Sequence, residues 1–285
     1  MAVISLTHST VQRYPSSARR SRNEVRLQPR DGGGHRLVEF NLEVSPTAEI
    51  DTERDYFDNT VWLVSVEAEH RELTITARSV VEWADDAPEE VSIPVAWDAE
   101  ELAGHPALEF ALPSPRVPRL SEVRALIQEL DLPPHPPAAL VGANQRLREI
   151  FTYQAGTTSV ATSLQEVLSL RVGVCQDFAH ALLAIARELG WPARYVSGYL
   201  VPEVGAEPGD SHAWVEICAG DGRWLGYDPT HGCAAGAGHI AVAVGRDYGD
   251  AAPVRGTFMS SAPGLAPEVS VITRRDVPGG PEMDQ

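Results

Sequence analysis

The chain contains no lysine, and arginine supplies all 23 of its positively charged side chains. Cysteine is also scarce, with three widely spaced residues among 285. An odd number of cysteines without a paired C-x-x-C motif excludes a disulfide framework and the usual zinc-binding patterns. We therefore expect a reducing compartment, in which a cysteine that matters acts as a thiol. Without lysine, the chain offers no primary amine of its own except at its N-terminus.

Long apolar runs and positive charge are missing as well. The first twenty residues include several arginines and no apolar stretch of signal-peptide length, and no later segment approaches the 18 or so apolar residues of a membrane span. We therefore expect a cytoplasmic protein without a membrane partner. The formal net charge of −17 excludes nucleic acid as a partner, because phosphate binding requires clustered positive charge. With 43% hydrophobic residues, the chain can still build a large core.

The first part of the chain, residues 1–112, has the pattern of an all-β domain. Apolar and polar residues alternate over residues 39–44, 60–68 and 71–83, and β-branched side chains are frequent there. Turn-forming clusters separate these stretches, and the segment "RDYFDN" is typical of a hairpin loop. We find no combination of nucleophile, base and orienting group in this domain.

A change of composition follows at residues 113–137, which contain seven prolines around a short helical pattern, "SEVRALIQEL". Proline removes backbone donors and restricts the chain, so we interpret this segment as a linker. Residues 138–256 then form a second domain, and residues 257–285 a C-terminal strand and flexible tail. The oligomeric state does not follow from these patterns.

The second domain is predicted to be α+β. Helical periodicity covers residues 139–153, a capping box at Ser163 and Glu166 opens a short helix, and a third helix is expected from Val174 to Gly190. Three strands then follow, containing "ARYVSGYLV", "HAWVEIC" and "RWLGYDPT". Helices followed by strands are typical of an α+β fold.

Cys175 is expected at the amino end of the third helix. Free backbone N–H groups and the positive end of the helix dipole favour a thiolate over a thiol at that position. The same N–H groups can stabilise an oxyanion on an attacked carbonyl. Since most free cysteines are only small hydrophobic residues, Cys175 alone is weak evidence for chemistry.

A histidine and an aspartate strengthen the case. His212 begins one strand, and Asp228 ends the next strand after a short "AGDG" turn. Antiparallel pairing of these strands would bring Asp228 close to His212, where a carboxylate can hold one imidazole nitrogen and leave the other for the thiol. A surface histidine and an Asp-Pro turn are the alternative interpretations. Together the three residues have the general form of nucleophile, base and orienter.

These motifs resemble the transglutaminase-like superfamily, in its bacterial and archaeal branch. The similarity rests on "RVGVCQDFAHALLAIARELGWPARYVSGYL", "DSHAWVEI" and "WLGYDPTHG", and it continues to about residue 256. The first domain is similar to the β-rich N-terminal domain of that branch. The resemblance implies a papain-like α+β core in which Cys175 is the nucleophile, His212 the general base and acid, and Asp228 the residue that orients the histidine.

Further residues are weaker candidates. Gln176, Tyr153 and Trp214 could contact the substrate or its oxyanion, although Trp214 could equally be a core residue, and Asp177 suits a capping role. Cys218 and Cys233 are expected to be buried or incidental. No calcium loop is present, and a zinc site built from cysteines and histidines would lack the short paired spacing of zinc ligands. We therefore expect no metal and no other cofactor.

Three kinds of function remain open at this point. A cysteine hydrolase acting on a peptide or protein amide is favoured, because water is always available as the acyl acceptor. An acyltransferase would pass the acyl group to an amine instead. A binding or scaffold protein on the same fold is the third possibility, against which the presence of all three triad residues counts.

Overall fold

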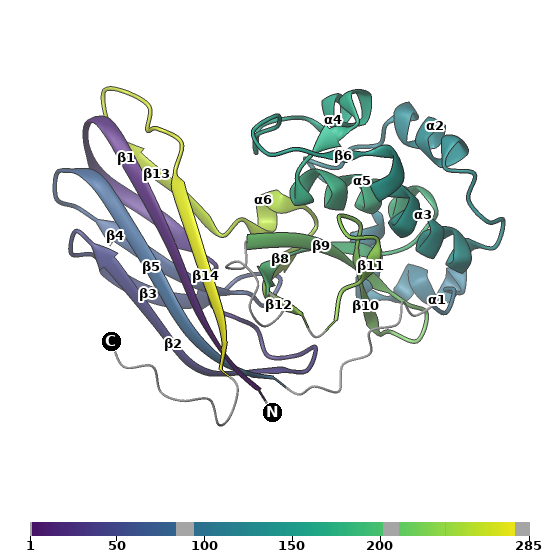
Figure 1. Cartoon of the computed structure of the whole chain (residues 1–285), viewed down its shortest axis with the longest axis horizontal. Coiled ribbons are helices and arrows are strands. Elements are labelled where there is room, and N and C mark those ends of the chain that lie inside the picture. The colour runs from purple at the N-terminus through teal and green to yellow at the C-terminus, as the bar shows by residue number, and fades with distance from the viewer. Residues whose placement is uncertain (1, 84–93, 202–210, 237, 277–285) are drawn as a thin grey trace.

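The computed structural model describes residues 2–83, 94–201, 211–236 and 238–276. Figure 1 shows a curled β-sheet on one side and a mixed region of helices and strands on the other. Both ends of the described chain lie in the curled sheet.

The curled sheet is organised around β1 (Ala2–Val25), a strand of 24 residues. The first half of β1 pairs with β5 (His70–Trp83) and with β14 (Glu268–Asp276). Its second half pairs with β4 (Thr60–Val66) and β13 (Val254–Met259). Sequence patterns located β4 and β5 but did not identify β1. β1, the central strand of the N-terminal sheet, thus pairs with two strands from the C-terminal part of the chain, β13 and β14.

The remaining strands of this sheet lie at its edges. β2 (His35–Ser45) pairs with β5, and β3 (Glu49–Arg54) pairs with β4. The hairpin loop predicted from "RDYFDN" is present between β3 and β4, and Asp55 accepts two backbone hydrogen bonds across it. Asn59, at the end of this loop, exchanges two hydrogen bonds of 2.8 Å with the backbone of Val244 in the second region.

The second region contains a five-stranded antiparallel sheet. Its strand order is β11-β10-β9-β8-β12. The strands are β8 (Ala193–Leu200), β9 (Ser211–Cys218), β10 (Trp224–Asp228), β11 (Cys233–Ala234) and β12 (His239–Gly245). The predicted pairing of β9 with β10 is confirmed, with Tyr227 opposite Val215. Ala213, Val215 and Ile217 face the main hydrophobic cluster, as their alternation predicts.

Helices cover one face of this sheet. The main ones are α3 (Pro136–Ile150), α4 (Leu164–Leu170) and α5 (Cys175–Glu188). The capping box at Ser163 and Glu166 is present at the start of α4. Sequence periodicity extended α3 too far, because Tyr153 lies in the short strand β6 (Thr152–Tyr153), paired with β7 (Val172–Gly173). The helical spacing of apolar residues continues past Ile150. However, the backbone of Thr152 and Tyr153 pairs with β7 as a parallel strand instead of continuing the helix.

The proline-rich segment is packed against the second region. It contains α2 (Ser121–Glu129), and its apolar side chains Val117, Val123 and Leu126 belong to the main hydrophobic cluster. Two short helical elements precede it, α1 (Ala99–Gly104) and the 3-10 helix η1 (Pro106–Ala111), which the sequence patterns did not reveal. The boundaries at residues 112 and 137 stay a prediction.

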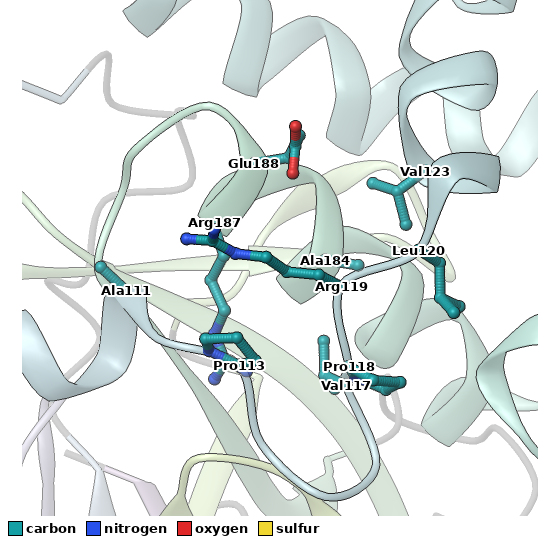
Figure 2. Close-up of a pocket in the computed structure, with 10 residues that line it drawn as sticks. All are labelled: Ala111, Pro113, Val117, Pro118, Arg119, Leu120, Val123, Ala184, Arg187 and Glu188. Atoms are coloured by element: carbon teal, nitrogen blue, oxygen red, sulfur yellow. The ribbon is translucent and has the colours of Figure 1, made fainter.

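Arg187 of α5 links η1 to the five-stranded sheet. Its guanidinium donates hydrogen bonds to the backbone oxygens of Phe110 and Ala193, both at 2.9 Å. Figure 2 shows the Arg187 side chain together with Ala111, Pro113, Val117 and Pro118, which line the same pocket. The pocket lined there is only about 20 Å³, room for a single water, and lies about 18 Å along α5 from Cys175.

The curled sheet and the helical region share one hydrophobic cluster. Ile4 and Leu6 of β1 and Val81 and Trp83 of β5 belong to the same cluster as buried side chains of α3, α4 and α5. The chain therefore has the predicted α+β class, with an all-β N-terminal region joined to a core of helices and a five-stranded antiparallel sheet. Within the described ranges, no helix combines the length and the apolar character that crossing a bilayer requires. The last residues, 277–285, in which we expect a flexible tail, lie outside the described part.

Candidate active site

Cys175 is the first residue of α5, as its sequence position predicted. Asp177, in the first turn of α5, caps the start of the helix. Its carboxylate accepts a hydrogen bond of 2.8 Å from the Val174 N–H and one of 2.6 Å from the Thr158 hydroxyl. Burial raises the pKa of Asp177, although these hydrogen bonds oppose the shift. Asp177 therefore has the capping role, and it holds the turn that carries the thiol.

Gly173 makes room for this cap. A Cβ atom at residue 173 would lie 2.5 Å from the Asp177 carboxylate, closer than non-bonded atoms approach. Glycine is therefore required immediately before the turn that presents Cys175.

His212 lies at the start of β9 and faces both predicted partners. Its Nε2 atom is 2.8 Å from Oδ2 of Asp228, and the Cys175 thiol lines the same cleft, close enough to act on the charge of the ring. Because Nε2 faces the carboxylate, Nδ1 is the nitrogen left for the sulfur. The fold thus brings Cys175, His212 and Asp228 together from α5, β9 and β10, with a hydrogen bond between His212 and Asp228.

The imidazole of His212 is basic in this setting. Burial disfavours its charged form, but hydrogen bonds and negative charge from Asp228 and Cys175 prevail and raise the pKa of His212 to about 9. Burial likewise works against an ionised Asp228, yet hydrogen bonds from histidines hold the pKa of that carboxyl far below its usual range. The site therefore favours an ionised carboxylate beside a readily protonated imidazole.

Asp228 is surrounded by three histidines rather than one. Besides His212, the Nδ1 atom of His231 lies 2.7 Å and the Nε2 atom of His239 3.0 Å from the same Oδ2 atom. Nδ1 of His239 accepts a hydrogen bond of 3.3 Å from the Gly236 N–H. The ring proton of His239 is therefore on Nε2, which donates the hydrogen bond to Asp228. Oδ1 of Asp228 accepts from the Thr230 N–H at 2.9 Å.

His231 and His239 were not singled out in the sequence. His231 follows Asp228 by three residues in "DPTHG", and this spacing was the available signal for it. His239 begins β12, 11 residues after Asp228, and no local spacing relates the two residues. Neither position could be assigned from strand periodicity alone.

One group of described side chains has the spacing to hold a cation. The ligand atoms of His212, Asp228 and His231 all lie within 4.8 Å of one another. Imidazole and carboxylate ligands suit zinc. However, two of these atoms already form the His212–Asp228 hydrogen bond, which a metal ion would have to replace.

The thiol opens into a cleft of about 250 Å³ between the core and the curled sheet. Gln176 lines this cleft beside Cys175, which suits its predicted contact with substrate or oxyanion. The other core residues in its lining include Val174, Tyr195, Ser197, Ser211, Ala213 and Tyr248.

Trp214 and Tyr153 are not among the residues that line this cleft. Trp214 is buried, with its ring stacked on His212 at a centroid distance of 6.4 Å, and it borders a separate cavity of about 310 Å³. Tyr153 is half exposed and contacts the ring of Phe178. Gly198 allows the position of Trp214, since a Cβ there would lie 2.5 Å from the indole ring.

The other two cysteines differ from Cys175. Cys218 is buried, and burial raises the pKa of its thiol to about 11. Cys233 is partly buried, and burial raises its pKa as well. Both thiols are therefore less prepared for nucleophilic attack at neutral pH.

Comparison with known proteins agrees with this architecture. Residues 4–82 match the family model of the bacterial transglutaminase-like N-terminal region, and residues 124–229 match that of the transglutaminase-like superfamily. An uncharacterized protein of Mycobacterium leprae is 36% identical over 89% of this chain and 92% of its own length. A protein-glutamine gamma-glutamyltransferase of Pseudomonas aeruginosa is 35% identical over 38% of this chain and 18% of its own length.

Solved structures share the fold. A protein of Cytophaga hutchinsonii, described as a candidate cysteine protease, superposes with a TM-score of 0.74 at 21% identity, covering 96% of this chain and 91% of that one. This likeness extends over the curled sheet as well as the core. The chain belongs to the transglutaminase-like superfamily, with the N-terminal region found in its bacterial members.

Proposed function

We propose that the chain is a thiol-dependent enzyme that forms an acyl-enzyme on Cys175 from an amide substrate, and that it transfers the acyl group mainly to water. The observation that carries this proposal is the His212–Asp228 hydrogen bond next to the Cys175 thiol, where both Cys175 and His212 line one cleft. A buried structural cysteine would need neither the imidazole nor the carboxylate behind it.

In the first half of the reaction, the Cys175 sulfur attacks the amide carbonyl while His212 holds the thiol proton. The carbonyl oxygen becomes an oxyanion, for which the Cys175 backbone N–H and the Gln176 side chain are the proposed donors. The C–N bond then breaks, and His212 gives its proton to the leaving amine. The product is a thioester on Cys175 and a free amine.

In the second half, His212 takes a proton from water as the oxygen attacks the thioester carbonyl. The C–S bond breaks, and the acid leaves as the Cys175 thiol is restored. Asp228 keeps the imidazole oriented in both halves and stabilises its charged form.

Acyl transfer to an amine is the second candidate. It is supported by the local similarity to the Pseudomonas aeruginosa protein-glutamine gamma-glutamyltransferase. The chemistry differs only in the group that attacks the thioester, so the same three residues would serve both reactions.

Product analysis separates these possibilities. The full chain would be incubated with peptide amide libraries and a labelled primary amine, and products weighed by mass spectrometry. Free acid that disappears in Cys175→Ala but persists in Cys218→Ala supports hydrolysis. Amine adducts with the same dependence support transfer. Turnover that survives in Cys175→Ala would rule out both reactions as proposed.

A further inference from the structure

The face of the curled sheet that borders the cleft has a defined composition. Thr10 of β1 is paired directly with Val269 of β14, and His8 is paired with Val271. Side chains directly opposite each other in an antiparallel pair share a face, and so do residues two apart in a strand. His8, Thr10 and Val269 all line the cleft that contains Cys175. The two ends of the chain therefore build one wall opposite the thiol.

This wall is fixed to the core. The Tyr199 hydroxyl of β8 lies 3.1 Å from Nδ1 of His8, and Nε2 of His8 lies 3.1 Å from the Thr10 hydroxyl. Ile4 and Leu6, on the same strand, are buried in the shared hydrophobic cluster. The wall thus has a set position relative to Cys175.

Uncharged groups dominate the cleft. Among the described residues that line it, none is an aspartate, glutamate or arginine, although the chain holds 63 such residues in all. His8 is buried, and its burial lowers its pKa to about 4, so it is neutral at physiological pH. Thr10, Ser197 and Gln176 supply polar groups without formal charge.

We propose that His8 and Thr10 of β1 and Val269 of β14 form a specificity wall that admits an acyl donor with an uncharged side chain and disfavours charged ones. This inference rests on the proposed function, because it concerns the substrate of the same thiol. Apart from the Cys175–His212 pair, the described residues of the lining offer a charged side chain no counter-charge, so its transfer from water costs free energy. A small apolar side chain pays no such cost, and an amide pays less because Thr10, Ser197 and Gln176 offer it hydrogen-bonding groups.

Labelling of Cys175 tests the wall without requiring turnover. Peptide vinyl sulfone probes would differ only in the side chain beside the electrophile, as glutamine, glutamate or arginine. The rate of Cys175 adduct formation, measured by mass spectrometry on the full chain, is expected to be at least tenfold higher for the glutamine probe. Faster labelling by either charged probe would overturn the inference.

Val269 allows a matched reversal, because its side chain is half exposed and tolerates replacement. Val269→Arg should raise the glutamate-to-glutamine rate ratio about fivefold, and Val269→Glu should do the same for the arginine probe. Val38 of β2, equally exposed and on a strand distant from β14, is the control for net charge. Val38→Arg and Val38→Glu should leave both ratios unchanged.

Different results would contradict the proposed chemistry of Cys175 and the proposed specificity wall. If no probe labels Cys175, the proposed function itself is wrong and the wall has no substrate to select. If Cys175 is labelled but the Val269 variants shift the ratios no more than the Val38 variants, only the specificity wall is wrong. Equal melting temperatures of the Val269 variants and the wild type would show that the fold is retained.

Discussion

Nε2 of His212 lies 2.8 Å from Oδ2 of Asp228, and both side chains are almost fully buried. A buried carboxylate is costly unless its charge is matched by donors. Here the charge is held by three imidazoles and by backbone N–H groups at the end of β10. The arrangement fixes the orientation of His212 toward Cys175 and raises the proton affinity of its ring.

Asp228→Asn should abolish most activity while leaving the fold in place. The amide keeps the shape of the side chain but removes the negative charge that raises the pKa of His212. We expect kcat/KM to fall by about two orders of magnitude or more, as expected when the orienting carboxylate of a triad is lost. Circular dichroism should remain that of the wild type. Activity within threefold of wild type would contradict the orienting role.

His239 should act as a positioning residue for Asp228. His239→Phe removes the donor 3.0 Å from Oδ2, whereas His239→Gln can replace it with an amide N–H. We expect kcat/KM to fall about tenfold or more in His239→Phe and to recover partly in His239→Gln, because hydrogen bonds to charged groups contribute about 1.5–3 kcal/mol.

The pH profile distinguishes positioning from general damage to the fold. Without the hydrogen bond from His239, the negative charge of Asp228 is stabilised by fewer donors and acts more strongly on His212. The pKa of His212 should therefore rise in His239→Phe. The pH at which the basic limb of the Cys175 alkylation profile occurs should therefore be higher in His239→Phe than in the wild type. In His239→Gln this pH should be close to the wild-type value again. A uniform loss of rate without a shift would argue for a purely structural role.

Gln176 and Tyr153 provide a matched test of the oxyanion donor. Gln176 lines the cleft and Tyr153 does not. Gln176→Ala should lower kcat by about tenfold to a hundredfold with little change in KM, because the oxyanion exists only in the transition state. Tyr153→Phe should leave both constants near wild type. The opposite ranking of the two variants would reassign the donor.

The raised pKa of His212 also makes stability depend on pH. An unfolded histidine has a pKa of about 6.5, and that of His212 in the folded chain is about 9. The stabilisation is therefore complete below about pH 6.5 and is lost as pH rises through 9. We expect the melting temperature of the wild type, relative to His212→Gln, to fall between pH 6.5 and 9.5. A gap that stays constant over this range would contradict the raised pKa.

Gly173→Ala should disturb the start of α5. The added methyl group would lie 2.5 Å from the Asp177 carboxylate and displace the cap of the helix. Loss of a cap costs about 1 kcal/mol, and the forced contact adds to this. We expect a lower melting temperature and slower alkylation of Cys175. Gly104→Ala is the control, because a Cβ at that position meets no atom within 4 Å.

Local patterns predicted much of the second region. Helical periodicity placed Cys175 at a helix start, and two alternating stretches joined by a short turn predicted the β9–β10 hairpin. These two features are enough to bring His212 near Asp228, because the register of a hairpin follows from its turn. The position of the three candidate residues could thus be inferred before the fold was known.

Features that depend on distant pairing could not be inferred in this way. The pairing of Thr10 with Val269 joins opposite ends of the chain, and no local period encodes it. His239 hydrogen-bonds Asp228 from a different strand, β12, which no local period relates to β10. Trp214 shares a strand face with His212, yet Gly198 lets its ring turn into a different cavity. Each of these depends on contacts outside its own element.

The most direct test of the reactive thiol compares alkylation of the three cysteines across pH. Iodoacetamide labelling, mapped by peptide mass spectrometry, would be measured from pH 5 to 10 in the wild type and in His212→Ala. At pH 6.5 we expect Cys175 of the wild type to react at least tenfold faster than Cys175 of His212→Ala, and far faster than Cys218. Equal rates of Cys175 labelling in the two proteins, or preferred labelling of Cys218 or Cys233, would contradict activation of the Cys175 thiol by His212.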